Sequence, residues 1–194
     1  MAYMRRRAGG YSGGYIETMD GAGHHVGKWD LLIAHPPCTF LSSAGSTLMF
    51  AADHSIKDMH RYNKMVEAKA FFMEFYKAEI NMICIENPAP LHIAGLPPYT
   101  QIIEPYMFGH PWKKRTCLWL NGLPRLEPTN IVRPTGCWVY QGFGGPGKTN
   151  RTKLKETVGV RSAKERSKTF PGIAAAMAEQ WGTPGGGYVQ MSLF

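Results

Sequence analysis

Two short apolar runs, separated by a long helical pattern, constrain the fold of this chain more than any other feature. Residues 29–34 (WDLLIA) run into a Pro-Pro pair, and residues 81–85 (NMICI) are closed by Pro88. Between them, residues 57–78 contain neither Gly nor Pro and repeat apolar side chains at helical spacing, which predicts an amphipathic helix. This order of strand, helix and strand predicts a parallel βαβ unit.

The carboxyl ends of parallel strands meet at one edge of a sheet, and open α/β sheets bind ligands there. We therefore expect the loops at residues 35–45 and 86–95 to face each other across one crevice. Further strands are predicted at residues 116–120 and 137–141, and a C-terminal helix at residues 170–181. The pattern as a whole predicts an α/β fold.

Composition and length indicate one globular domain with extensions. The 194 residues are 44% hydrophobic and 19% charged, which excludes a chain that is disordered throughout. Residues 1–27 are predicted to form a flexible basic, Gly-rich arm, residues 28–182 the α/β domain, and residues 183–194 a flexible tail. No apolar run approaches the ~20 residues of a membrane span, and the N-terminus lacks a secretion signal. The four cysteines show no pattern of a disulfide scaffold, so we expect a reducing cytoplasm and no membrane association.

The charge balance favours a polyanionic partner. The chain has 22 Lys and Arg against 14 Asp and Glu, a net charge of +8, which indicates DNA as a partner. Basic residues are densest within the Gly-rich loop region at residues 142–168, where Lys148, Arg151 and Lys153 are candidate phosphate contacts. The alternative interpretation of that stretch is a solvated run of charge.

The predicted crevice brings Cys38 towards Glu86. A thiolate is a strong nucleophile, and a nearby carboxylate can hold or protonate the heterocycle that it attacks, so the pair favours covalent catalysis. The alternative is that Cys38 is a small buried side chain and Glu86 a solvated loop residue.

Four blocks along the chain resemble motifs of the C5-cytosine DNA methyltransferases. Residues 30–42 (DLLIAHPPCTFLS) resemble the catalytic-loop motif of this family, and residues 85–88 (IENP) resemble its ENV motif. Residues 109–115 (GHPWKKR) resemble the GVP…RxR segment, and residues 171–178 (PGIAAAMA) resemble the last motif, a helix beside the cofactor. Over about residues 28–182 the chain is similar to small phage-type methylase-like proteins, which implies a phage origin.

This resemblance implies a Rossmann-like, class I methyltransferase fold: a mostly parallel sheet with flanking helices. It also implies that a cytosine is flipped out of the DNA stack. Cys38 then adds to C6, Glu86 contacts N3 and the exocyclic amine, and C5 takes a methyl group from S-adenosylmethionine. The residues so implied are Cys38, Glu86, Asn87 and Arg115 for catalysis, Asp30, Pro36, Pro37, Gly172 and Ile173 for the cofactor, and Ser42, Lys113 and Lys114 for DNA.

The sequence also departs from the family. The first motif of the family, an apolar strand with an acidic Gly-rich turn, has no counterpart in residues 1–37, so this part is expected to be truncated or replaced. Either another chain completes the cofactor site, or S-adenosylmethionine is not bound. Two alternatives therefore stay open. One is a degenerate, non-enzymatic protein that binds DNA or a partner; the other is a Cys-dependent pyrimidine-modifying enzyme that uses another donor or a free nucleotide.

Three shorter signals accompany these blocks. Residues 142–149 match the phosphate-binding pattern GxxxxGK[ST], but no docking helix or magnesium-binding Asp follows, so a nucleotide hydrolase is disfavoured. His35 has no metal-ligating neighbour at ligand spacing, and no metal site is predicted. The final five residues resemble the peptide by which bacterial proteins dock on the sliding clamp, with Gln190, Leu193 and Phe194 as the contacts; the alternative is a frayed tail.

Overall fold

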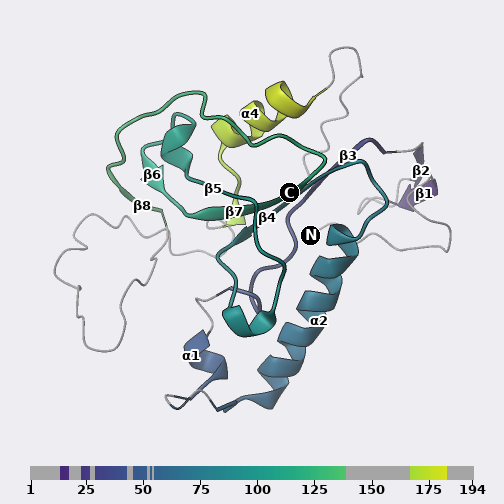
Figure 1. The fold of residues 1–194 in the computed structure, drawn as a ribbon, viewed down its shortest axis with the longest axis vertical. Helices are drawn as coiled ribbons and strands as arrows, with labels where there is room; N and C mark the ends of the chain where they lie inside the picture. Colours follow the sequence, from purple (N-terminus) through teal and green to yellow (C-terminus); the bar gives the residue numbers. More distant parts are fainter. Residues whose placement is uncertain are drawn as a thin grey trace.

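The main sheet of the computed structural model has four strands in the order β3-β4-β7-β5 (Figure 1). Its strands are β3 (Leu31–Ala34), β4 (Met82–Pro88), β5 (Gln101–Ile103) and β7 (Thr116–Asn121), and the two longest helices are α2 (Met59–Tyr76) and α4 (Pro171–Trp181). The smaller elements are β1 (Gly14–Glu17), β2 (Gly23–Val26), α1 (Ser46–Met49), η2 (His92–Ala94), η3 (Pro105–Met107), β6 (Trp112–Lys113) and β8 (Gly136–Cys137). The structure describes residues 14–17, 23–26, 29–42, 46–51, 53, 55–138 and 167–182.

The prediction of a mostly parallel, Rossmann-like sheet is wrong. β3 and β4 pair in parallel, but β7 is antiparallel to both β4 and β5. A parallel return after β4 would need a long crossover, usually a helix. The segment between β4 and β7 is interrupted by proline, which is excluded from helix interiors, and its helical elements are only the 3₁₀ turns η2 and η3, beside the short strands β5 and β6. The chain therefore returns antiparallel, and the sheet is mixed.

Most of the predicted elements are confirmed. The strand predicted at residues 29–34 is β3, the helix predicted at 57–78 is α2, and the helix predicted at 170–181 is α4. The N-terminus of α2 is capped by Asp58, whose side chain accepts a hydrogen bond from the backbone N–H of Arg61 at 2.9 Å.

The strands predicted at 81–85 and 116–120 are β4 and β7. Of the strand predicted at residues 137–141, Cys137 belongs to β8 (Gly136–Cys137), which pairs with β6 and not with the main sheet. Residues 139–141 lie outside the described residues.

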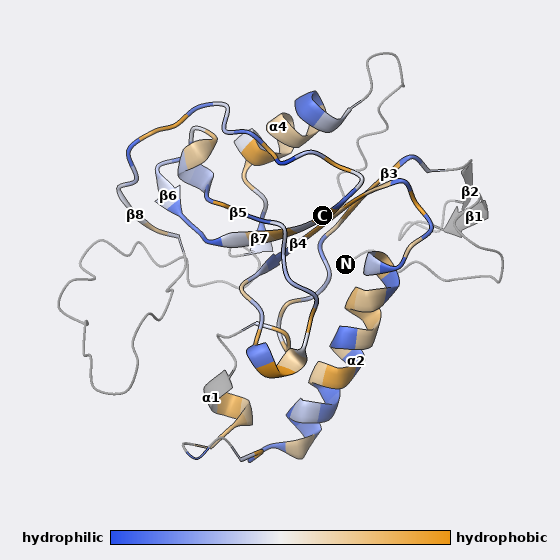
Figure 2. Cartoon of the chain, viewed as in Figure 1, coloured by the Kyte–Doolittle hydropathy of each residue, from blue (hydrophilic) through white to orange (hydrophobic). Residues whose placement is uncertain are grey.

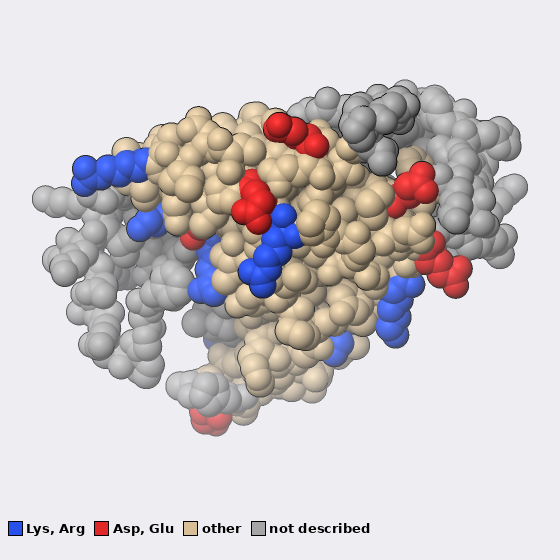
Figure 3. Space-filling view, turned by 45° about the horizontal axis from the view of Figure 1, so that its top comes forward, with Lys and Arg blue, Asp and Glu red and all other residues tan. Residues whose placement is uncertain are grey.

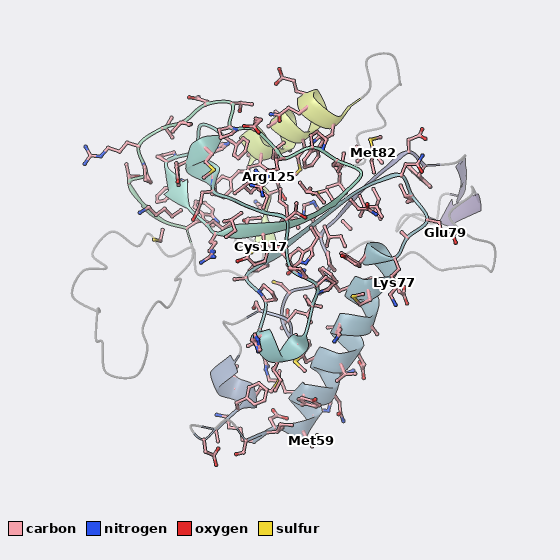
Figure 4. The ribbon with its side chains drawn as sticks, viewed as in Figure 1. Met59, Lys77, Glu79, Met82, Cys117 and Arg125 are labelled. Atoms are coloured by element: carbon pink, nitrogen blue, oxygen red, sulfur yellow. The ribbon has the colours of Figure 1, made fainter. Side chains whose placement is uncertain are left out.

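Both faces of the sheet are buried. Along β4, Ile83 and Ile85 belong to the hydrophobic cluster that contains Phe72 of α2, whereas Cys84 belongs to the cluster that contains Ile173 of α4. Figure 1 shows α2 and α4 on opposite sides of the sheet, and Figure 4 shows Cys117 between them. Strands covered on both faces are continuous apolar runs, as Figure 2 shows for β3 and β4.

Strands β1 and β2 form an antiparallel pair within residues 1–27, where the sequence predicts a flexible arm. Residues 183–194, predicted to be a tail, lie outside the described residues, and so does most of the loop region 142–168. In the described part of the chain, no helix combines the length and the apolarity needed to cross a membrane.

Candidate active site

The carboxyl ends of β3 and β4 bring the first two motif blocks together. The parallel register pairs Ala34 with Ile85, so that His35 and Glu86 come next on adjacent strands. Nδ1 of His35 and Oε2 of Glu86 are hydrogen-bonded at 3.0 Å. The side chain of Glu86 is 17% exposed and that of His35 is 45% exposed, so the carboxylate is the more enclosed of the two.

Asn87 attaches the Pro-Pro segment to β4. Its Nδ2 donates a hydrogen bond to the carbonyl oxygen of Pro36 at 3.1 Å, and the residue is only 2% exposed. Pro36 is buried as well, so the bond joins two groups that water does not reach. Leaving one such group without a partner costs about 1–3 kcal/mol, which makes this bond a strong constraint on the backbone that leads to Cys38.

Cys38 lies at the start of a tight turn. Its carbonyl oxygen accepts hydrogen bonds from the backbone N–H groups of Leu41 at 3.1 Å and Ser42 at 2.9 Å. The turn is attached to the segment after β4, because the N–H of Leu91 donates to the carbonyl of Leu41 at 2.7 Å and Ser42 forms a β-bridge with Pro90. Cys38 itself is half-buried, at the same edge of the sheet as Glu86.

Helix α2 supports this turn through Arg61. Nη2 of Arg61 donates to the carbonyl oxygen of Thr39 at 3.3 Å, and the guanidinium lies 5.0 Å from the centre of the Phe40 ring. Cation–π contacts of this kind stabilise by about 0.5–1 kcal/mol at exposed sites. The two residues after Cys38 are therefore held from the side of α2, and Arg61 is not among the residues that the sequence predicts for this site.

Lys114 is the cation of the site. Burial lowers its pKa, and the negative charges of Glu86 and Cys38 act in the opposite direction, which brings these three groups into one electrostatic environment. Nζ of Lys114 donates to the carbonyl oxygen of Lys168 at 3.0 Å and lies 5.9 Å from the centre of the Phe170 ring. Its ammonium is thus enclosed by the segment that precedes α4.

The three basic residues of the third block differ in their surroundings. Lys113 is exposed, as a DNA contact requires, whereas Lys114 is half-buried near Cys38. The guanidinium of Arg115 donates to the hydroxyl of Tyr99 at 3.4 Å, and its Nε is buried and has no hydrogen-bond partner among the described residues. Ser42, implied as a DNA contact, is 9% exposed.

Two further thiols lie within the sheet and differ from Cys38. Burial raises the pKa of Cys84 far above its usual range and raises the pKa of Cys117 to about 11, with the charge of Glu86 adding to both shifts. A thiol that stays protonated is a poor nucleophile. Cys38 and Cys137 are both half-buried, but only Cys38 lies at the edge that carries Glu86.

Two of the residues implied for S-adenosylmethionine are engaged in packing within the fold. The N–H of Gly172 donates to Nε2 of His110 at 3.0 Å, and a Cβ at this glycine would clash with the carbonyl oxygen of Phe108. Ile173 is 4% exposed, inside the core. Asp30 precedes β3, and Pro36 and Pro37 follow it. Packing therefore accounts for Gly172 and Ile173 without a cofactor.

The structure thus brings Cys38, Glu86 and Asn87 together and adds two residues whose position the sequence did not reveal, His35 and Lys114. His35 directly follows the apolar run of β3, and Glu86 directly follows the apolar run of β4. Once the parallel register of these two strands is known, His35 and Glu86 are expected side by side. Lys114 was predicted to contact DNA, together with Lys113 and Ser42. Six predicted contacts lie outside the described residues: Lys148, Arg151, Lys153, Gln190, Leu193 and Phe194.

Among the described residues, no three His, Cys, Asp or Glu side chains form a group that could hold a metal ion. Comparison of the chain with models of protein families, with curated proteins and with solved structures finds no match.

Proposed function

We propose that the chain is a C5-cytosine DNA methyltransferase-like protein in which Cys38 adds covalently to C6 of a flipped cytosine. One observation carries the proposal: the turn of Cys38 and the Glu86 carboxylate lie at the same edge of the β3–β4 pair, joined through the bond from Asn87 to Pro36. A nucleophile and a proton-exchanging group held by rigid backbone are what covalent addition to a heterocycle needs.

The side chains of the site supply the steps of addition. The Cys38 thiolate forms the S–C6 bond, and the electron pair displaced from the C5–C6 double bond is delocalised onto N3. Glu86, which lies at the same edge of the sheet as Cys38, holds N3 and the exocyclic amine and passes a proton to N3. Lys114 stabilises the thiolate before attack, because its ammonium lies near both Cys38 and Glu86. The adduct is an enamine with a nucleophilic C5.

Methyl transfer to that C5 is the function that the resemblance implies, with S-adenosylmethionine as the donor. Since packing accounts for Gly172 and Ile173, the proposal assigns this cofactor to other residues of the chain or to a second chain. The packing of Gly172 against Phe108 also favours a second candidate, a protein that captures the base without S-adenosylmethionine.

DNA is the proposed partner because the net charge is +8. On the face shown in Figure 3, the described basic side chains are scattered, and several of them lie near acidic ones. The proposal therefore places the main phosphate contacts in the basic stretch 148–168 and at exposed Lys113. The cytoplasm, of a bacterial host if the chain is phage-encoded, is the proposed location.

Two modified DNAs separate the candidates. DNA with pyrimidin-2-one in place of cytosine is attacked at C6 and retains the adduct without a methyl donor, so it reports the addition alone. DNA with 5-fluorocytosine retains the adduct only after methyl transfer. We expect a gel-shifted species with pyrimidin-2-one DNA that is lost in Cys38→Ser and kept in the matched variant Cys137→Ser, whose thiol is also half-buried.

Each outcome has a defined meaning. A 5-fluorocytosine adduct that depends on S-adenosylmethionine supports the methyltransferase, and an adduct with pyrimidin-2-one DNA alone supports the second candidate. Glu86→Gln should slow addition by about 100-fold or more while DNA affinity stays unchanged, since it acts on the base in the transition state. If the wild-type chain forms no adduct with either DNA in varied sequence contexts, the covalent proposal is wrong.

A further inference from the structure

We propose that His35 carries the proton that Glu86 delivers to the base, so that an imidazole and a carboxylate act together at this site. The inference deepens the proposed function and rests on it. His35 does not touch the base in this scheme; it acts through Glu86 as a positioning and proton-supplying residue. The neighbouring Asn87, by contrast, only fixes the backbone.

The geometry gives the pair a path between water and the site. Nδ1 of His35 is bonded to Oε2 of Glu86 at 3.0 Å. With 45% of its side chain exposed, His35 reaches solvent, while Glu86 is 17% exposed and lies on the side of Cys38 and Lys114. Within the described part of the chain, Nδ1 is the only ring nitrogen of His35 with a hydrogen bond, which leaves Nε2 to exchange protons with water.

The chemistry of addition requires such a supply. An ordinary carboxylic acid has lost its proton at pH 7, whereas an imidazole still exchanges one near that pH. Attack of the Cys38 thiolate forms the S–C6 bond and leaves an electron pair on N3. One proton then moves from Nδ1 of His35 to the Glu86 carboxylate and from the carboxyl group to N3. Without methyl transfer, reversal of the addition breaks the S–C6 bond, restores the C5–C6 double bond and the thiolate, and returns the N3 proton through Glu86 to His35.

The other charged and titratable groups that face Glu86 do not replace His35. These groups are Cys84 on β4, Lys114 before β7 and Cys117 on β7, and Lys114 also lies near Cys38 on the turn. The two buried thiols stay protonated, and the Cys38 thiol is the nucleophile itself. The ammonium of Lys114 donates to the carbonyl oxygen of Lys168. His35 is the remaining neighbour, and its ring is hydrogen-bonded to the Glu86 carboxylate.

A purely structural role for His35 makes a different prediction. An ion pair that is nearly half exposed on one side contributes little to stability, so its loss should leave the melting temperature unchanged. The proton-carrier role predicts instead a loss of rate and a changed pH dependence. His35→Gln is the informative variant, because a glutamine amide can still donate a hydrogen bond to Glu86 but carries no exchangeable charge.

The experiment measures the single-turnover rate of adduct formation by the full chain with pyrimidin-2-one DNA between pH 5 and 9. The wild-type rate should rise as the Cys38 thiolate forms and fall as His35 loses its proton. His35→Gln should be at least about tenfold slower at pH 7 and lose the falling limb, at unchanged melting temperature and DNA affinity. Imidazole added to His35→Ala should restore part of the rate. The exposed His92 provides the matched control, and His92→Ala should behave as the wild type.

The outcomes distinguish failure of this inference from failure of the proposed function on which it rests. An absent wild-type adduct overturns the proposed function and the role of His35 together. A wild-type adduct that His35→Gln forms at the normal rate overturns only the role of His35. A falling limb that persists in His35→Gln assigns that limb to another group, such as Lys114, and overturns the proton-carrier role as well.

Discussion

Replacing Gly172 by Ala tests whether the last motif block is fixed by packing or by a cofactor. An ideal Cβ at this position lies 2.0 Å from the carbonyl oxygen of Phe108 and 3.0 Å from Nε2 of His110. Carbon–oxygen contacts in proteins rarely fall below about 3 Å, so the N-terminus of α4 would have to shift by about 1 Å. Forced shifts of this kind cost about 1–3 kcal/mol, and loss of the bond from the Gly172 N–H to His110 adds about 1 kcal/mol.

Helix propensity predicts the opposite sign, since Ala is favoured over Gly in a helix by up to about 1 kcal/mol. The net expectation is a loss of about 2–3 kcal/mol in the free energy of unfolding, measured by urea denaturation without any ligand. Ala175→Gly, at an exposed position of the same helix, serves as the control and should lose about 1 kcal/mol. A Gly172→Ala protein as stable as the wild type would refute the packing argument and return Gly172 to a role in ligand binding.

Three further predictions concern the site, the core and the tail. Lys114→Met should slow alkylation of Cys38 by iodoacetamide at pH 7 by about threefold or more, because less thiolate forms, while exposed Lys113→Met should not; peptide mass spectrometry measures both rates. The pKa of Cys117 is raised from 9.0 to about 11, so its contribution to stability is complete below pH 9 and is lost as the pH rises towards 11. Over that range Cys117→Ala should show a decline in unfolding free energy that is shallower by up to about 3 kcal/mol. Deleting residues 190–194 should abolish pull-down of the bacterial sliding clamp without changing the melting temperature; clamp binding that persists would contradict the docking role.

Apolar runs and helical spacing were enough to predict the centre of the fold. β3 and β4 are continuous apolar segments because helices cover both faces of the sheet, and such runs are visible in a single sequence. β5 was missed because Gln101–Ile103 is too short to show a period. The antiparallel direction of β7 was not predicted, because an apolar run looks the same in a parallel and in an antiparallel strand. The connection before it, rich in proline and without a helical repeat, did indicate that no crossover helix could form.

Cys38 and Glu86 could be predicted because both side chains are chemically reactive and each follows an apolar strand. The parallel pair of β3 and β4 places both residues at one edge of the sheet. The contact between His35 and Glu86 depends on the register of two strands, which the sequence does not contain, and a lone histidine is usually solvated or satisfied elsewhere. Arg61 was missed for a similar reason, because its contact with the Cys38 turn depends on how α2 docks.

The mixed sheet changes the chemistry of the site rather than only its topology. In a parallel sheet, the residues that precede a strand lie at the edge opposite to the carboxyl ends of its neighbours. Because β7 is antiparallel to β4, its first residue, Thr116, pairs with Pro88, the last residue of β4. The chain just before β7 therefore passes the edge that carries Glu86, and this is why Lys114 comes within the electrostatic reach of Glu86 and Cys38. In the proposed mechanism, the antiparallel return thus supplies the cation near the Cys38 thiolate, from a block of sequence that would otherwise lie at the far edge of the sheet.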